Sequence, residues 1–103
     1  MQHYPLTQTE TSLMERLVLD ENISYVHAVL TVGEAFTPHA TDAPVYMTVI
    51  QGTLQLKSEE GTVNRFQAPT LVTIPKGTWI GISNGGDSPL ELIVVKAPAP
   101  IPR

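Results

Sequence analysis

The sequence predicts an all-β domain, a small antiparallel sandwich or barrel, from three observations. Turn-forming residues recur along the chain, as at positions 20–22, 42–44, 59–61 and 84–87. The runs between these turns are short and rich in Val, Ile, Thr and Leu. Several runs alternate apolar and polar residues, which is the pattern of a strand with one buried face. Short β-type runs at this spacing are typical of sandwiches and barrels and not of alternating βα units.

The predicted strands follow one another, and a turn signal ends each of them. The first could also form a helix, because Ser12 and Glu15 mimic a capping box. We predict a strand there because the run leads into a turn and a second β-type run. Residues 53–57 alternate cleanly, whereas residues 90–95 are almost continuously apolar, as expected of a strand covered on both faces. The predicted strands span residues 14–19, 23–32, 45–50, 53–57, 62–66, 71–74 and 90–95.

The two ends of the chain differ in composition from its middle. We predict an N-terminal arm at residues 1–12, a β-barrel domain at residues 13–96 and a Pro-rich C-terminal tail at residues 97–103. Prolines cannot donate ladder hydrogen bonds, so we expect the tail to be extended. A chain of 103 residues has room for one core, and its 42% hydrophobic residues are enough to fill that core.

Composition also argues against several classes of function. The formal net charge is −4 and the six basic residues are scattered, so duplex nucleic acid is a poor partner. The absence of cysteine excludes disulfides, thiolate metal sites and cysteine nucleophiles. No apolar run approaches the roughly 20 residues of a membrane span, and no signal-peptide pattern begins the sequence. We therefore expect a cytoplasmic protein with no nucleic-acid or membrane partner.

Two stretches carry a spaced pattern of Gly, His, Pro and Asn. Residues 33–52 read GEAFTPHATDAPVYMTVIQG, and residues 75–84 read PKGTWIGISN. Both stretches resemble the paired signature motifs of the cupin family. The matching residues are Gly33, His39 and Gly52 in the first motif and Pro75, Gly77 and Asn84 in the second. The resemblance implies a cupin-like jelly roll, in which two antiparallel sheets form a small β-barrel.

Most of the side chains that bind metal in that family are replaced here. Thr41 stands at the second His position, Val45 at the Glu position and Ile80 at the last His position. Pro69 also replaces the leading Gly of the second motif. A first-row metal site needs at least three good protein ligands, and of the family's four positions only His39 supplies one. We therefore predict no metal and no other cofactor.

The resemblance implies a barrel interior that is mostly apolar and holds one titratable group, which describes a small-molecule site. His39 could anchor an anionic or hydroxylated ligand, or act as a general acid or base. Alternatively, it could simply be hydrogen-bonded to Thr41 or to a backbone carbonyl. The candidate ligand-binding residues are Phe36, His39, Thr41, Val45, Met47, Ile80 and Ile82.

Strand parity places other aromatic and polar side chains outside the barrel. Tyr46 and Trp79 precede residues assigned to the pocket, so we expect both to face outward. The residues on either side of His27 belong to the more apolar face of their run, so we expect His27 to point away from the core, with the pocket mouth as the alternative. Open sheet edges need cover, and we predict a homodimer with contacts near residues 14–19 or around Tyr46.

Three functions stay open at this point. The first is a metal-free module that binds a small, partly apolar ligand, such as a sugar-derived or carboxylic metabolite, near His39. The second is an isomerase, epimerase or lyase that uses His39 as acid or base, with Tyr25 or His27 as the second proton-transfer residue. The third is a residual metal-dependent cupin, in which His39 and water bind iron, manganese or nickel with help from His27, Asp42 or His3.

Overall fold

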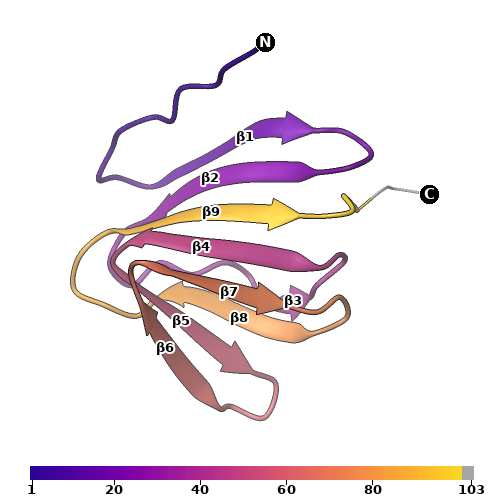
Figure 1. Cartoon of the computed structure of the whole chain (residues 1–103). Coiled ribbons are helices and arrows are strands. Elements are labelled where there is room, and N and C mark those ends of the chain that lie inside the picture. The colour runs from indigo at the N-terminus through magenta and orange to yellow at the C-terminus, as the bar shows by residue number, and fades with distance from the viewer. Residues whose placement is uncertain (101–103) are drawn as a thin grey trace.

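The computed structural model describes residues 1–100, and this part of the chain folds into two antiparallel sheets (Figure 1). The prediction of an all-β fold is confirmed, and the described residues contain no helix. None of them therefore forms a helix that could cross a membrane. The strands are β1 (Leu13–Leu19), β2 (Ser24–Leu30), β3 (His39–Ala40), β4 (Val45–Gln51), β5 (Thr53–Ser58), β6 (Val63–Gln67), β7 (Thr70–Ile74), β8 (Trp79–Asn84) and β9 (Leu90–Lys96).

The sheet order brings strands that are distant in sequence next to one another. One sheet has five strands in the order β1-β2-β9-β4-β7, and the other has four in the order β3-β8-β5-β6. In Figure 1 the larger sheet runs from β1 to β7 and the smaller one packs below it. The strand β4, within the first motif, and the strand β8, within the second, therefore lie in different sheets, and inward side chains of both line the space between the sheets.

The seven predicted strands are all present, with ends shifted by one or two residues. The first of them, β1, is a strand and not a helix, and it pairs with β2 along its length. The strands β3 and β8, which lie inside the two motifs, were not among the predicted runs. In β8 the sequence WIGISN includes a glycine and two polar residues, and these dilute its apolar pattern.

Alternating burial places the core between the sheets. In β4, Val45, Met47 and Val49 are buried, whereas Tyr46 and Thr48 face solvent. Such alternation is expected of a strand that is covered on one face. The strand β9, which was predicted to be covered on both faces, lies between β2 and β4, and its consecutive residues Leu92 and Ile93 are both buried.

The glycines retained from the motifs occupy backbone conformations that other residues adopt at a cost. Gly33, Gly52 and Gly77 have φ values of 83°, 88° and 81°. At Gly52 a Cβ atom would also lie 2.5 Å from the carbonyl oxygen of Pro89. Positive φ and close backbone approach both require the absence of a side chain. These motif glycines are therefore explained by the turns of the fold alone.

The motif residue Asn84 likewise has a structural role. Its buried Nδ2 donates hydrogen bonds to the carbonyl oxygens of Leu30, at 3.0 Å, and Ser88, at 2.8 Å. Its Oδ1 accepts a hydrogen bond from the backbone N–H of Gly86 at 2.9 Å. One side chain thus joins the end of β2 to the turn between β8 and β9.

Both ends of the described chain contact the barrel. Residues 1–12 contain no strand, but Thr7 donates both its backbone N–H and its hydroxyl to the carboxylate of Glu15 in β1. At the other end the N–H of Ala97 donates to the carbonyl of Pro44, and Ala99 is buried. Of the tail predicted at residues 97–103, Ala97 and Ala99 therefore pack against the domain, Pro98 is exposed, and residues 101–103 lie outside the described part.

Candidate functional site

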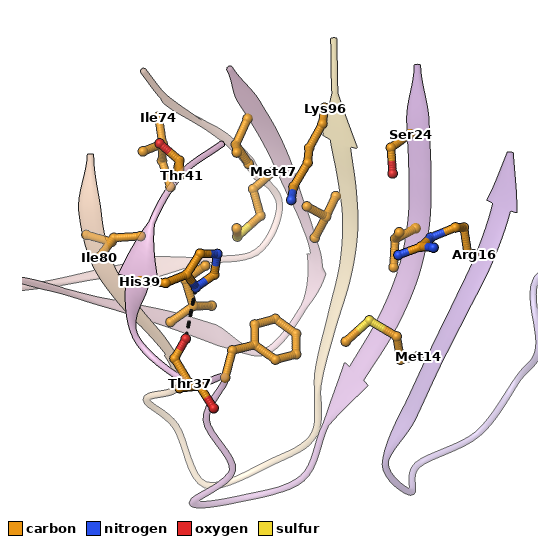
Figure 2. Close-up of a pocket in the computed structure, with 15 residues that line it drawn as sticks. Met14, Arg16, Ser24, Thr37, His39, Thr41, Met47, Ile74, Ile80 and Lys96 are labelled. Carbon is orange, nitrogen blue, oxygen red and sulfur yellow. Dashed lines mark hydrogen bonds between the residues drawn. The ribbon is translucent and has the colours of Figure 1, made fainter. Parts of the chain in front are cut away.

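A cavity of about 360 Å³ opens between the two sheets, and its lining is mostly apolar (Figure 2). The larger sheet contributes side chains from β1, β2, β4, β7 and β9, and the smaller sheet contributes β3 and β8. The lining residues are Met14, Arg16, Ser24, Val26, Phe36, Thr37, His39, Thr41, Val45, Met47, Ile74, Ile80, Ile82, Val94 and Lys96.

All seven residues predicted to form a ligand site line this cavity. Val45 and Met47 point inward because they alternate with outward residues on β4, and Ile80 and Ile82 do the same on β8. His39 opens β3, and Phe36 and Thr41 lie on the segments before and after that strand. The structure thus brings these seven side chains together around one cavity. Ligand binding by them is a proposal.

His39 lies at an exposed part of the cavity wall and has one hydrogen bond. Its Nδ1 is 2.9 Å from the carbonyl oxygen of Thr37, drawn as a dashed line in Figure 2. A carbonyl can only accept, so Nδ1 carries the proton in this contact. In the neutral ring, Nε2 is then left with a lone pair. The alternative that a backbone carbonyl holds this histidine is confirmed, and its second nitrogen has no partner among residues 1–100.

Thr41 is buried, and its hydroxyl group already makes two hydrogen bonds within the fold. The hydroxyl donates to the carbonyl oxygen of Pro75 at 2.7 Å and accepts the backbone N–H of Thr78 at 3.0 Å. Backbone hydrogen bonds link Thr41 to Thr78 and Gly77 as well. The residue at the second His position of the family therefore fastens the first motif to the second. Its hydroxyl proton is used by the fold and cannot be donated to a ligand.

The residues at the four family positions do not fit a metal ion. His39 brings one imidazole, Val45 and Ile80 bring hydrocarbon, and the hydroxyl of Thr41 is used by the fold. In the described part of the chain, no three His, Asp or Glu side chains gather as a metal-binding group. A Lewis-acid role at this position would need at least three donors.

The residues considered as replacement ligands lie elsewhere or are engaged. Asp42 pairs with the ammonium group of Lys96 at 2.9 Å, and this hydrogen bond lowers the pKa of Asp42. His3 belongs to the N-terminal arm and lines a shallow depression with Tyr25 on the outer face of the larger sheet. The third candidate, His27, also belongs to that outer face.

His27 points away from the barrel interior, as expected from parity, but it is not exposed. Its side chain is fully buried between two carboxylates: Nδ1 lies 2.6 Å from Glu15 on β1, and Nε2 lies 2.7 Å from Glu91 on β9. Burial lowers the pKa of His27, but the hydrogen bonds to Glu15 and Glu91 and the negative charges of both carboxylates together outweigh that effect and raise the pKa above 6.5. The hydrogen bond from His27 is the largest cause that lowers the pKa of Glu15 to about 2. The alternative placement at the pocket mouth is wrong, because β2 lies between two strands that each direct a glutamate at it.

The prediction of a single titratable group in the cavity is also wrong. Arg16 on β1 and Lys96 on β9 line it as well, together with the hydroxyl-bearing Ser24 on β2. These residues share the inner face because Ser24 pairs with Lys96 and Arg16 pairs with Val26 across the sheet. The alternation of Met14 and Arg16 with Glu15 could have indicated this, once the first run had been assigned to a strand. The position of β1 beside β2 and β9 was needed to place the cations.

The scan against protein-family models finds no match. The chain is 31% identical over 91 residues to the uncharacterized protein MJ0764 of Methanocaldococcus jannaschii, and the match covers 88% of this chain and 78% of that one.

Solved crystal structures from several organisms share the fold. The crystal structure of MJ0764, described as an RmlC-like cupin family protein with a double-stranded β-helix fold, superposes with a TM-score of 0.92 at 29% identity and covers 97% of this chain and 93% of the other. A cupin-like protein of Thermotoga maritima gives 0.78 at 17% identity, covering 88% and 71%, and a cupin domain of Bordetella pertussis gives 0.73 at 15%, covering 90% and 99%. This chain belongs to the RmlC-like cupin family.

Proposed function

We propose that this protein binds a small organic molecule in the cavity between its sheets, through contacts of the polypeptide that require no metal ion. The observation that carries the proposal is the cavity itself. Its volume of about 360 Å³ lies within the range of small-molecule sites. The side chains that replace the family's metal ligands leave it open and mostly apolar.

The lining favours a ligand with an apolar body and at least one polar group. Met47 is unbranched and adapts to irregular shapes, and Phe36 adds an aromatic surface. With Nδ1 donating to the Thr37 carbonyl, Nε2 of the neutral His39 ring can accept one hydrogen bond at the cavity wall. Burial of a phenyl-sized apolar surface of about 150 Å² contributes about 4 kcal/mol before the costs of association.

Binding is favoured over catalysis because the expected acid–base pair does not form. The sequence offered Tyr25 or His27 as the partner of His39, and both lie on the outer face of the larger sheet. Both nitrogens of His27 are also bonded to carboxylates. Neither residue can exchange a proton with a molecule bound beside His39.

The test uses 3-phenylpropanamide, a neutral molecule with an aromatic body, titrated into protein with labelled Met and Ile methyl groups. We expect chemical-shift changes at Met47, Ile80 and Ile82 and a Kd on the order of 1 mM, as for a small fragment. Val94→Phe fills the cavity from β9 and should abolish these changes. Val95→Phe makes the same change on the opposite face of β9 and should leave them intact.

Two results would reject the proposal. One is that an excess of 3-phenylpropanamide above about 1 mM changes none of the methyl chemical shifts of Met47, Ile80 and Ile82. The other is equal binding by the Val94→Phe and Val95→Phe variants. If Val94→Phe does not fold, as judged by circular dichroism, Ile82→Phe fills the cavity from the smaller sheet and replaces it, with the shifts read at Met47 and Ile80.

A further inference from the structure

We propose that the cavity selects organic monocarboxylates, and that Arg16, Ser24 and Lys96 bind the carboxylate group. We call these three residues the basic corner. The inference rests on the proposed function, since it names the class of molecule that occupies the same cavity. The apolar body of the ligand would lie against Met47 and Ile80, and its charged end would lie at the basic corner.

Sheet register brings the basic corner together from three neighbouring strands. Ser24 on β2 is the direct partner of Lys96 on β9, and Arg16 on β1 is the direct partner of Val26. Direct partners on one face have Cβ atoms about 5 Å apart, and diagonal neighbours are about 7–8 Å apart. Arg16 is the diagonal neighbour of Ser24, so long side chains here can reach one carboxylate. Figure 2 shows the three side chains on one wall and His39 on the facing sheet.

Ser24 provides an independent indication of a ligand. The residue is 5% exposed, yet its hydroxyl has no hydrogen-bond partner within residues 1–100. No side-chain polar atom in that part of the chain is both fully buried and unpaired, so the remaining exposure of Ser24 includes its Oγ. Because Ser24 lines the cavity, this donor is directed into it. Buried hydroxyl groups are normally hydrogen-bonded, and a bound acceptor would satisfy this one.

The charges at the corner favour a single negative group. Arg16 forms no ion pair or side-chain hydrogen bond with any residue from 1 to 100, so its guanidinium group remains available. Lys96 donates one of its three N–H groups to Asp42, 2.9 Å away, and retains two. Two protein cations, Arg16 and Lys96, are therefore balanced by one protein carboxylate, that of Asp42. Glu15, next to Arg16 in sequence, points to the other face of the sheet and binds His27.

A monocarboxylate matches this arrangement better than an inorganic anion. The corner has one uncompensated positive charge, and most of the remaining cavity is hydrocarbon that only an organic body can cover. A guanidinium group binds a carboxylate through two parallel hydrogen bonds, and the Ser24 hydroxyl and a Lys96 N–H can satisfy the other lone pairs.

The experiment compares 3-phenylpropanoate with 3-phenylpropanamide, which share shape and apolar body and differ in charge. Hydrogen bonds to a charged group predict that the acid binds about 10- to 100-fold more tightly. Arg16→Gln should reduce this preference at least severalfold. Arg65→Gln on β6, outside the cavity, is the matched control and should keep the wild-type preference. The affinities of each protein for the acid and for the amide are measured by calorimetry at one fixed ionic strength.

The possible outcomes separate this inference from the proposed function. Equal affinity for acid and amide, or an unchanged preference in both Arg16→Gln and Ser24→Ala, overturns the basic corner and leaves the proposed function in place. Failure of both molecules to bind overturns the proposed function itself. Displacement of 3-phenylpropanoate by inorganic phosphate at a comparable concentration would identify an inorganic-anion site and would also overturn the inference.

Discussion

Replacing Asn84 with alanine is expected to destabilise the fold strongly, although Asn84 does not line the cavity. The amide makes three hydrogen bonds, to the carbonyls of Leu30 and Ser88 and from the N–H of Gly86. The bond to Leu30 is buried, whereas the other two are partly buried. Alanine leaves the Leu30 carbonyl in a place that water reaches poorly, and the two turn groups lose their link to the end of β2.

The magnitude follows from these three bonds. A buried polar group left without its partner costs about 1–3 kcal/mol, and each partly buried bond contributes about 0.5–1.5 kcal/mol. We expect Asn84→Ala to lower the free energy of unfolding by about 3 kcal/mol in total. For a domain of this size, that change lowers Tm by roughly 12–24 °C.

Urea unfolding followed by far-UV circular dichroism would measure this loss. Asn64→Ala on β6 is the matched control, because Asn64 is exposed and forms no side-chain hydrogen bond within the described residues. We expect it to change the free energy of unfolding by less than about 0.5 kcal/mol. A loss below about 1 kcal/mol for Asn84→Ala would refute the view that the fold alone explains this motif residue.

Three further predictions follow from the turns, the buried histidine and the outer face. Gly52→Ala should lower the free energy of unfolding by at least about 1 kcal/mol more than Gly33→Ala. Both glycines have a positive φ, but a Cβ at Gly52 would lie 2.5 Å from a backbone oxygen, whereas a Cβ at Gly33 would meet open space. Pairing with the two glutamates raises the pKa of His27, so the charged His27 should stabilise the fold fully below pH 6.5, and this stabilisation should be lost as the pH rises through the folded-state pKa. Glu15, with a pKa of about 2, should stabilise the fold above pH 4.5, and this second contribution should be lost as the pH falls toward 2. Urea midpoints of the wild type and of His27→Gln, measured from pH 2 to 9, check this: only the wild type should lose stability as the pH rises through the His27 pKa. The predicted homodimer should give twice the 11.2 kDa chain mass in light scattering, and Tyr46→Glu should give a monomer, whereas a monomeric wild type would end that prediction.

Seven of the nine strands in the described residues could be predicted from the sequence because their positions depend on local patterns. Side chains alternate with a period of two, so the inward set of Val45 and Met47 follows from the sequence once β4 is recognised. Motif spacing then placed His39 and Ile80 in the same cavity. These predictions require no knowledge of which strands are neighbours.

The predictions that were wrong depended on neighbouring strands. Nothing local to His27 shows that Glu15 and Glu91, 12 and 64 residues away, will lie on either side of it. Likewise, Arg16 and Lys96 line the cavity only because β1, β2 and β9 are adjacent in the larger sheet. Registers between distant strands are set by the whole fold, and the sequence shows them only indirectly.

A crystal soaked in 3-phenylpropanoate gives the most direct test of the claim that this cavity binds an organic acid through protein groups alone. The account predicts difference density between the sheets, with the ring beside Met47 and Ile80 and the carboxylate within hydrogen-bond distance of Arg16 and Ser24. Density that lies only on the outer surface at saturating concentration, or a carboxylate that points away from both residues, would contradict it.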